Sequence, residues 1–264
     1  MGVKPMPSKS KLSIHLISYE LRNTMGNMLT LFFGLVFPIF LSILIIKTQI
    51  VGNVPYDQIM SAYTSIFITM MLLIPLAISL IGYAANYTRE LEENSPLRLR
   101  LFGISDTSIL IAKMIANLIF LLVAIAIYTG VDLAFIYIYK PVLGAIFIQL
   151  AVVILIGAIL ILMAHSIANI FKKFGPTYAI TMTLYFVFMI FGGMMGIQTS
   201  QFSHAVQQIA KIMPMTFISN TDYATFWQTG TYNFGPLALS FLGFFGVALV
   251  LFLISLFKNR RFSK

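Results

Sequence analysis

The chain has 264 residues, of which 59% are hydrophobic and only 9% are charged, and its mean hydropathy is +0.93. A soluble domain carries about 25% charged residues, so this composition excludes an ordinary soluble protein and indicates an integral membrane protein. There is no cysteine, which excludes disulfide bonds and thiolate metal sites. The net charge of +9 does not by itself indicate nucleic-acid binding, because the positions of the basic residues matter more than their sum.

Residues 10–22 have the pattern of an amphipathic helix. Lys11, His15 and Arg22 fall on one basic stripe, while leucine and isoleucine side chains occupy other faces. This pattern is typical of a helix that lies in the membrane interface with its cations near lipid phosphates. A helix packed on the protein itself is the alternative.

Six apolar segments are long enough to cross a bilayer, which needs about 20 residues per helix. They are residues 28–46, 63–87, 108–128, 142–170, 177–197 and 236–257. Pro38 and Pro75 lie inside the first two spans, and we expect them to kink these helices. The sequence therefore predicts an all-α integral membrane protein, with six transmembrane helices in a single domain over residues 1–264.

The Lys and Arg residues predict the orientation of these spans. If both termini lie on one side, that side holds fourteen of the seventeen basic residues, and the other holds Lys47, Lys140 and Lys211. Loops rich in Lys and Arg stay in the cytoplasm. We therefore expect a multi-pass protein of the bacterial cell (plasma) membrane with both termini in the cytoplasm.

The loop between the last two spans is long for a compact domain, which suggests structure of its own. Within residues 203–228, the segments Ser203–Met213 and Thr216–Gln228 have helical patterns, and Pro214 separates them. Neither segment can cross a bilayer. The pattern predicts short interfacial or re-entrant helices on the outer face, where Trp and Tyr are favoured.

A polar hinge, residues 88–113, separates the second and third spans. Ser95 can cap a helix, Pro96 suits its first turn, and Gly103 is a natural stop. The sequence therefore predicts a cytoplasmic helix of about two turns over residues 96–102.

This short helix has two unlike faces. Leu97 and Leu101 lie on a face that we expect to pack on the ends of the spans. Arg98, Leu99 and Phe102 lie on a face that would be exposed, as in a docking surface. A plain loop with a solvated run of charges is the alternative.

The topology and the hinge resemble the type-2 permease subunits of ATP-binding-cassette (ABC) exporters. The hinge motif of these permeases has an E-x-E pair, a Gly-Thr step, a short apolar-basic helix, a Pro-x-Ser exit, and a Lys eight residues after that Ser. The corresponding positions here are Glu90, Glu92, Asn94, Ser95, Gly103, Ser105 and Lys113. Asn-Ser replaces Gly-Thr and Gly replaces Pro, which keeps the capping and helix-breaking roles.

The resemblance implies that residues 96–102 are a coupling helix, which docks into a groove of a separate ATPase subunit. It also implies an assembly of two ATPases with two permeases, the second being another copy or a related chain. This chain lacks a G-x-x-x-x-G-K-[ST] phosphate loop, so we expect no catalytic residue and no cofactor in it; the partner ATPase would bind ATP and Mg. The implied docking residues are Glu90, Glu92, Ser95, Pro96, Leu97, Arg98, Leu99, Arg100, Phe102 and Gly103.

In this family the substrate path lies between the two copies and is lined by spans one, two and five. The candidate lining residues here are Phe33, Phe37, Phe67, Met70, Met71, Phe186 and Met189. We find no charged residue deep in a predicted span, which favours an apolar or amphipathic cargo such as a drug, a lipid or a hydrophobic peptide. The alternative is that these side chains face lipid or neighbouring helices. Near the end of span five, Gly192, Gly193 and Gly196 allow either close helix contact at a dimer seam or a flexible span end.

Two other classes are compatible with this topology. Prenyl-endopeptidase-type intramembrane proteases use an E-E-x-x-x-R motif; here Arg98 follows Glu92 and Glu93 one position too late, although His165 and Asn169 match a later pattern. The acidic pair lies in the hinge and not inside a span, where a protected site would be held. A non-transporting immunity or sensory membrane protein is the other alternative.

Overall fold

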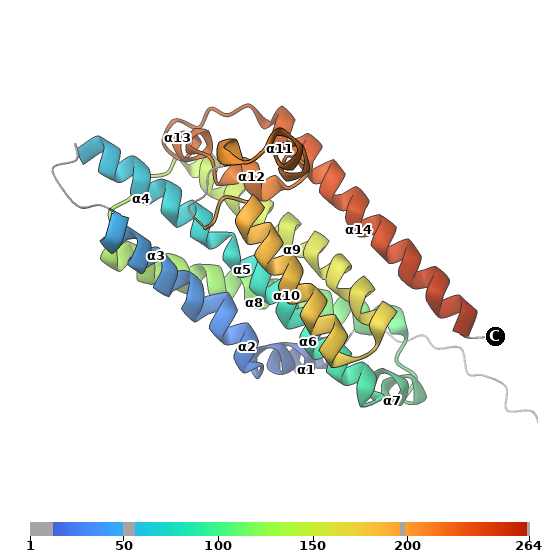
Figure 1. Cartoon of the computed structure of the whole chain (residues 1–264). Helices are drawn as coiled ribbons and strands as arrows, with labels where there is room; N and C mark the ends of the chain where they lie inside the picture. The colour runs from blue at the N-terminus through green and yellow to red at the C-terminus, as the bar shows by residue number, and fades with distance from the viewer. Residues whose placement is uncertain (1–12, 50–55, 196–198, 263–264) are drawn as a thin grey trace, which may run out of the picture.

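The computed structural model describes residues 13–49, 56–195 and 199–262, and every regular element in these ranges is helical (Figure 1). Residues 10–12 of the predicted N-terminal helix and Gly196 of the predicted glycine cluster lie outside the described residues.

Six helical segments are long and apolar enough to cross a membrane, which confirms the predicted all-α, six-span class. They are Met28–Thr48, Asp57–Glu92, Asp106–Phe135, Leu143–Phe171, Phe174–Phe191 and Phe234–Lys258. The second span differs most from its prediction, because its helix continues through the first part of the polar hinge.

Four of the spans are single helices, and two are interrupted. The single helices are α8 (Asp106–Phe135), α9 (Leu143–Phe171), α10 (Phe174–Phe191) and α14 (Phe234–Phe262). The first span consists of α2 (Met28–Leu31), the π-helical η1 (Phe32–Val36) and α3 (Phe37–Gln49). The second consists of α4 (Tyr56–Met71), α5 (Leu73–Pro75), the π-helical η2 (Leu76–Gly82) and α6 (Tyr83–Glu92).

A proline lies beside each π-helical segment. Pro38 follows η1 closely, and Pro75 directly precedes η2. Proline has no N–H and so removes one backbone hydrogen bond from a helix. Prolines and π turns are both recognised causes of helix distortion. The distortions predicted at the two prolines thus coincide with stretches of π-helix.

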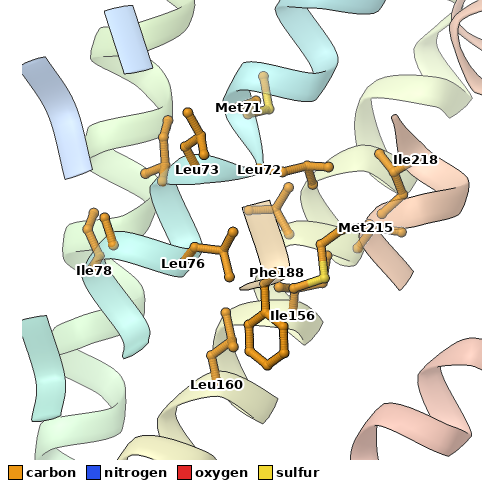
Figure 2. Packing of buried hydrophobic residues seen from close by; sticks show 14 of the residues in the cluster. Met71, Leu72, Leu73, Leu76, Ile78, Ile156, Leu160, Phe188, Met215 and Ile218 are labelled. Atoms are coloured by element: carbon orange, nitrogen blue, oxygen red, sulfur yellow. The ribbon is translucent and has the colours of Figure 1, made fainter. Parts of the chain in front are cut away.

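The second span forms the centre of the bundle. In its most apolar stretch 89% of the residues are buried, compared with 28% in the first and fifth spans and 22% in the sixth. Figure 2 shows Leu72, Leu73 and Leu76 of this span among apolar side chains from the surrounding helices, including Ile156 and Phe188. The spans at the periphery therefore expose most of their apolar surface, as expected for helices that face lipid or another chain.

Glycines allow the first two spans to approach closely at their π-helical segments. A Cβ atom at Gly34 would lie 2.6 Å from Cγ1 of Ile78, and one at Gly82 would overlap the side chain of Thr30. Small residues at such contacts are a common means of packing helices in membranes. Spans one and two therefore pack so closely at these positions that a larger residue would clash.

The helix α1 (Ile14–Met25) packs along α8 through one ridge made of Leu16, Glu20 and Thr24. Ile14 and Tyr19, on other faces of α1, are exposed. One ridge of this helix therefore packs on the protein, which was the alternative prediction. Its exposed apolar side chains are available for contact with a membrane surface, which was the main prediction. Figure 1 shows that α1 and α7 (Ser95–Leu101) lie at the same end of the bundle, which we name the α7 end.

Three short helices, and not the two predicted, cover the opposite end of the bundle (Figure 1). They are α11 (His204–Ala210), α12 (Pro214–Ile218) and α13 (Thr221–Thr229), preceded by a 3-10 turn, η3 (Thr199–Gln201). Trp227 of α13 is buried, and its Nε1–H donates a hydrogen bond of 3.0 Å to the carbonyl oxygen of Tyr139. This tryptophan therefore anchors the outer helices to the protein.

Asp132 lies inside α8 and is fully buried, although the third span was predicted to end at residue 128. The hydroxyl of Ser42 on α3 donates a 2.6 Å hydrogen bond to its Oδ2. The other carboxylate oxygen, Oδ1, has no hydrogen-bond partner among the described residues. Asp132 therefore lies in the last turn of the span and not deep inside it, and it is part of the helix because α8 is longer than the apolar run that predicted it.

Candidate functional site at the α7 end

The predicted hinge is a helical corner built from α6, α7 and α8 (Figure 1). After α6, Asn94 adopts a left-handed conformation with φ 57°, and α7 begins at the next residue. Gly103 has φ +82°, a value that glycine adopts at little cost. The side chain of Ser105 then accepts a hydrogen bond from the backbone N–H of Ser108 and caps α8. The predicted glycine stop is therefore confirmed, and Ser105 is the residue that caps the third span.

The start of α7 differs slightly from its prediction. Ser95 is the first residue of the helix and not its cap, because the reversal of the chain falls at Asn94. Pro96 occupies the first turn, as predicted, and is buried. Pro96 therefore anchors the helix to the bundle while the rest of α7 extends outward.

The exposed face of α7 is not the face that the sequence predicted. Leu97 and Leu101 were expected to pack inward, but 52% and 81% of their surfaces are exposed. Leu99, expected outside, is half-buried, whereas Arg98 and Phe102 are exposed as expected. The difference arises because only Pro96 and the following turn hold this short helix, so neighbouring residues, not the helix pattern, set its rotation. The result is an exposed apolar surface, Leu97, Leu101 and Phe102, beside a cation.

A buried ion triad lies beneath this corner. The Nζ of Lys113 on α8 lies 2.6 Å from Oε2 of Glu20 on α1 and 2.6 Å from Oε2 of Glu90 on α6. Only 6%, 3% and 10% of these three side chains is exposed. Asn23 adds a hydrogen bond of 2.7 Å from its Nδ2 to Oε1 of Glu90. The triad thus joins α1, the end of span two and the start of span three.

One lysine faces two carboxylates in this triad, so the positive charge does not neutralise both. Burial raises the pKa of Glu20, the Lys113 ammonium lowers it, the nearby Glu90 carboxylate raises it again, and the net direction is upward. The Oε1 atom of Glu20 also has no hydrogen-bond partner among the described residues. Glu20 is therefore the member of the triad that takes up a proton more readily than a free glutamate does.

The remaining acidic residues of the hinge have different surroundings. Glu92 is exposed, and its Oε1 accepts a hydrogen bond of 2.8 Å from the backbone N–H of Phe174 at the start of α10. The guanidinium of Arg89 lies 4.6 Å from the centre of the Phe174 ring. Glu93 is exposed. In this chain the first glutamate of the E-x-E pair thus binds a buried lysine, and the second holds the hinge to span five.

A polar cluster lies next to the triad, inside the bundle. Tyr83 and Tyr87 of α6 meet His165 and Asn169 of α9: the Tyr83 hydroxyl lies 3.0 Å from Nδ1 of His165, and Tyr87 stacks on the imidazole ring at 4.7 Å. The Tyr87 hydroxyl donates to Oδ1 of Asn169 at 3.4 Å. No group of three or more His, Asp or Glu residues able to hold a metal ion occurs among the described residues. The histidine and asparagine considered for a protease are thus bonded to tyrosines.

The candidate path residues fall into two groups. Phe33 and Phe37 on span one are half-buried, and Phe186 on span five is exposed. Phe33 lies 6.2 Å from the ring of the buried Tyr185, which lies 5.4 Å from the ring of Phe186, so these rings form an aromatic row across spans one and five, of which Phe186 is the exposed end. The others are buried in the core of the single chain: Phe67, Met70, Met71 and Met189.

Sequence reasoning missed Glu20 as a member of the site, although it had found Glu90 and Lys113. The available signal was the position of Glu20 on the same helical ridge as Leu16 and Thr24, the ridge that is buried. An acidic side chain on a ridge that packs inward needs a cation, and Lys113, within a predicted span, needed an anion.

Comparison with known proteins identifies no family. No protein-family model matches the chain, and no curated protein matches it. The fold and the site define the class: an all-helical, multi-pass membrane protein with six candidate membrane spans, and with a short helix exposed at one end of the bundle.

Proposed function

We propose that the chain is the membrane-spanning permease subunit of an ATP-driven ABC exporter. The observation that carries the proposal is the construction of α7. An exposed apolar surface with an adjacent cation projects from the bundle, and the helices on both sides of it are joined by the buried triad. A surface of this kind suits docking in a groove of a partner, and force applied to it passes directly to spans two and three.

In this proposal α7 is the coupling helix and the α7 end lies in the cytoplasm, in agreement with the distribution of Lys and Arg. Two ATPase subunits, which bind ATP and Mg, dock on two permeases, the second being another copy or a related chain. Closure of the ATPases moves the helical corner of each permease and exposes the path to the outside. The two permeases then have two states, and contacts at the hinge shift the balance between them. Neither catalysis nor a cofactor is assigned to this chain.

The cargo proposed is apolar or amphipathic. Phe186, the exposed end of the aromatic row on spans one and five, would contact such a cargo or the second permease. The charged side chains of Lys113 and Asp132, in the third span, do not favour a hydrophilic cargo, because Lys113 is bound by two glutamates and Asp132 by Ser42. Both are directed inside one chain and not toward a path between two chains.

Co-purification tests this proposal. The tagged chain, extracted from its native membrane in a mild detergent, should carry an ATPase subunit, and Leu101→Asp or Phe102→Asp should release it while the chain remains inserted. The matched control is Ile209→Asp, which changes an exposed isoleucine on α11, at the opposite end. Purification of the wild-type chain without any ATPase would refute the proposal and favour the immunity or sensory alternative.

A double alanine replacement tests the protease alternative. In a protease, Glu92→Ala with Glu93→Ala should abolish all cleavage of a substrate peptide. In a permease the same change should leave the fold intact and reduce at most the coupling to ATP hydrolysis, because both side chains are exposed and Glu92 bonds only one backbone amide among the described residues.

A further inference from the structure

A cavity of about 650 Å³ opens at the α7 end between spans two, three, four and six. Pro96, Leu97 and Arg100 of α7 form one of its walls, and Leu97 also belongs to the exposed apolar surface of α7, whose other members, Leu101 and Phe102, lie outside the cavity. Its volume lies within the range of small-molecule sites, about 300–1,000 Å³. The cavity therefore has room for a lipid headgroup and part of the attached chains.

The walls of this cavity are of two kinds. Arg100 of α7 and Lys172, at the end of α9, lie on the lining, together with the amides of Asn94 and Asn169. A third cation is near, because the Nζ of Lys258 on α14 lies 5.7 Å from the centre of the ring of Phe171, the residue before Lys172. This part of the cavity favours an anion.

The opposing wall is apolar. It is formed by Leu110 of α8 and by Phe252 and Leu256 of α14. Leu253 and Phe257, the next exposed residues of α14, continue the apolar surface outward on the face of a peripheral span. An acyl chain that starts in the cavity can thus continue along the surface that α14 presents to lipid.

The acidic groups near the site do not cancel its positive charge. Asp106 lines the cavity and forms an exposed ion pair with Arg100. Lys113 also lines the cavity but is bound by Glu20 and Glu90, so the triad adds no positive charge and at most one negative charge, against the three cations Arg100, Lys172 and Lys258. Lys172 has no ion pair among the described residues. A phosphate placed between Arg100 and Lys172 would therefore meet two cations and one carboxylate, that of Asp106.

We propose that this cavity binds one anionic phospholipid from the leaflet at the α7 end. The phosphate lies between Arg100 and Lys172, and part of the acyl chains lies against Leu110, Phe252 and Leu256. Basic pockets between transmembrane helices, at headgroup depth, are a known form of anionic-lipid site. The lipid would join α7 to α14, two elements that are otherwise connected through α8 and α9.

Native mass spectrometry of the purified chain in detergent tests this binding with phosphatidylglycerol and phosphatidylcholine as probes. We expect the wild type to retain phosphatidylglycerol preferentially. The double variant Arg100→Gln/Lys172→Gln should bind it about 25-fold more weakly, because each basic group near a membrane surface contributes a factor of about five. The control Lys47→Gln/Lys211→Gln removes the same charge from exposed lysines outside the cavity and should bind as the wild type does.

Two outcomes of this assay would overturn the proposal. One is equal retention of the two lipids by the wild type. The other is equal loss of phosphatidylglycerol from both double variants, which would indicate a general effect of charge. If inorganic phosphate at millimolar concentration displaces the lipid completely, the site binds free phosphate and the lipid assignment is wrong.

A spin label locates the lipid independently of these affinities. Because the chain has no cysteine, Thr107→Cys on the cavity wall and Thr225→Cys on α13 each provide a single labelling position. Spin-labelled phosphatidylglycerol should broaden the spectrum at position 107 and not at 225; equal spectra would refute the location. Both assays use the chain alone, so their failure would leave the exporter proposal standing, and failed co-purification would leave the lipid site standing.

Discussion

The buried ion triad gives the sharpest test of how the corner is held. Lys113→Met keeps most of the length of the side chain but removes its charge. It leaves Glu20 and Glu90 buried and close together, with no cation between them. Removing one partner of a buried ion pair costs about 3–5 kcal/mol of unfolding free energy, because the remaining charge stays in a poorly solvated site. At about 1.4 kcal/mol per factor of ten, the unfolding equilibrium should shift by roughly 100- to 4,000-fold.

Unfolding of the purified protein by sodium dodecyl sulfate in mixed micelles measures this free energy. The matched control is Arg100→Gln, which removes one partner of an exposed ion pair, with Asp106, whose side chains are 54% and 62% exposed. Exposed pairs contribute about 0–1 kcal/mol, so this variant should unfold almost as the wild type does. The triad also contains a control of its own. Glu20→Gln leaves one lysine with one glutamate and should cost much less than Lys113→Met.

The reasoning would be refuted if Lys113→Met unfolded within 1 kcal/mol of the wild type, or if Glu20→Gln were the more damaging change. If Lys113→Met does not accumulate in the membrane, a triple variant tests the same reasoning. It replaces Glu20 and Glu90 by Gln and Lys113 by Met. That variant has no buried charge at this place, so it should recover most of the lost stability. Failure of the triple variant to recover would show that shape, and not charge, holds the corner.

Other measurements follow from the spans and from Glu20. Gly34→Leu should destabilise the protein by about 1–3 kcal/mol through overpacking against span two, whereas Gly130→Leu should not, because no atom lies within 4 Å of a Cβ there. Ser42→Ala should cost about 1–3 kcal/mol, since it leaves the buried Asp132 without its donor, and adding Asp132→Leu should recover part of this. The pKa of Glu20 is raised above the ordinary 4.5, so protonation of Glu20 favours the folded state. This contribution to the free energy of unfolding should be present at acid pH and should disappear as the pH rises through the folded-state pKa. Glu20→Gln should remove this pH dependence.

The sequence predicted those features that depend on local composition. Apolar runs of sufficient length predicted six spans, because an uncharged stretch of about 20 residues has few soluble alternatives. Pro96 and Gly103 predicted where the short helix begins and ends, because a preference for the first helical turn and a left-handed backbone conformation are local properties.

Features that depend on distant neighbours could not be predicted in the same way. Glu20 and Lys113 are 93 residues apart, and only packing of α1 on α8 brings them together. The rotation of α7, which exposes Leu101 and half-buries Leu99, depends on what holds the helix at Pro96. Asp132 was misplaced because hydropathy marks where a span is apolar and not where its helix ends.

The π-helical segment η2 makes the distance between the two ends of span two adjustable. An α-helix advances 1.5 Å and turns about 100° per residue, whereas a π turn contains additional residues in one turn. A change of one residue between the two forms would shift α6 along its axis by about 1.5 Å relative to α4 and rotate it by about 100°. Because α6 carries Glu90 and leads directly into α7, such a change would move and rotate α7 relative to the helices at the opposite end of the bundle.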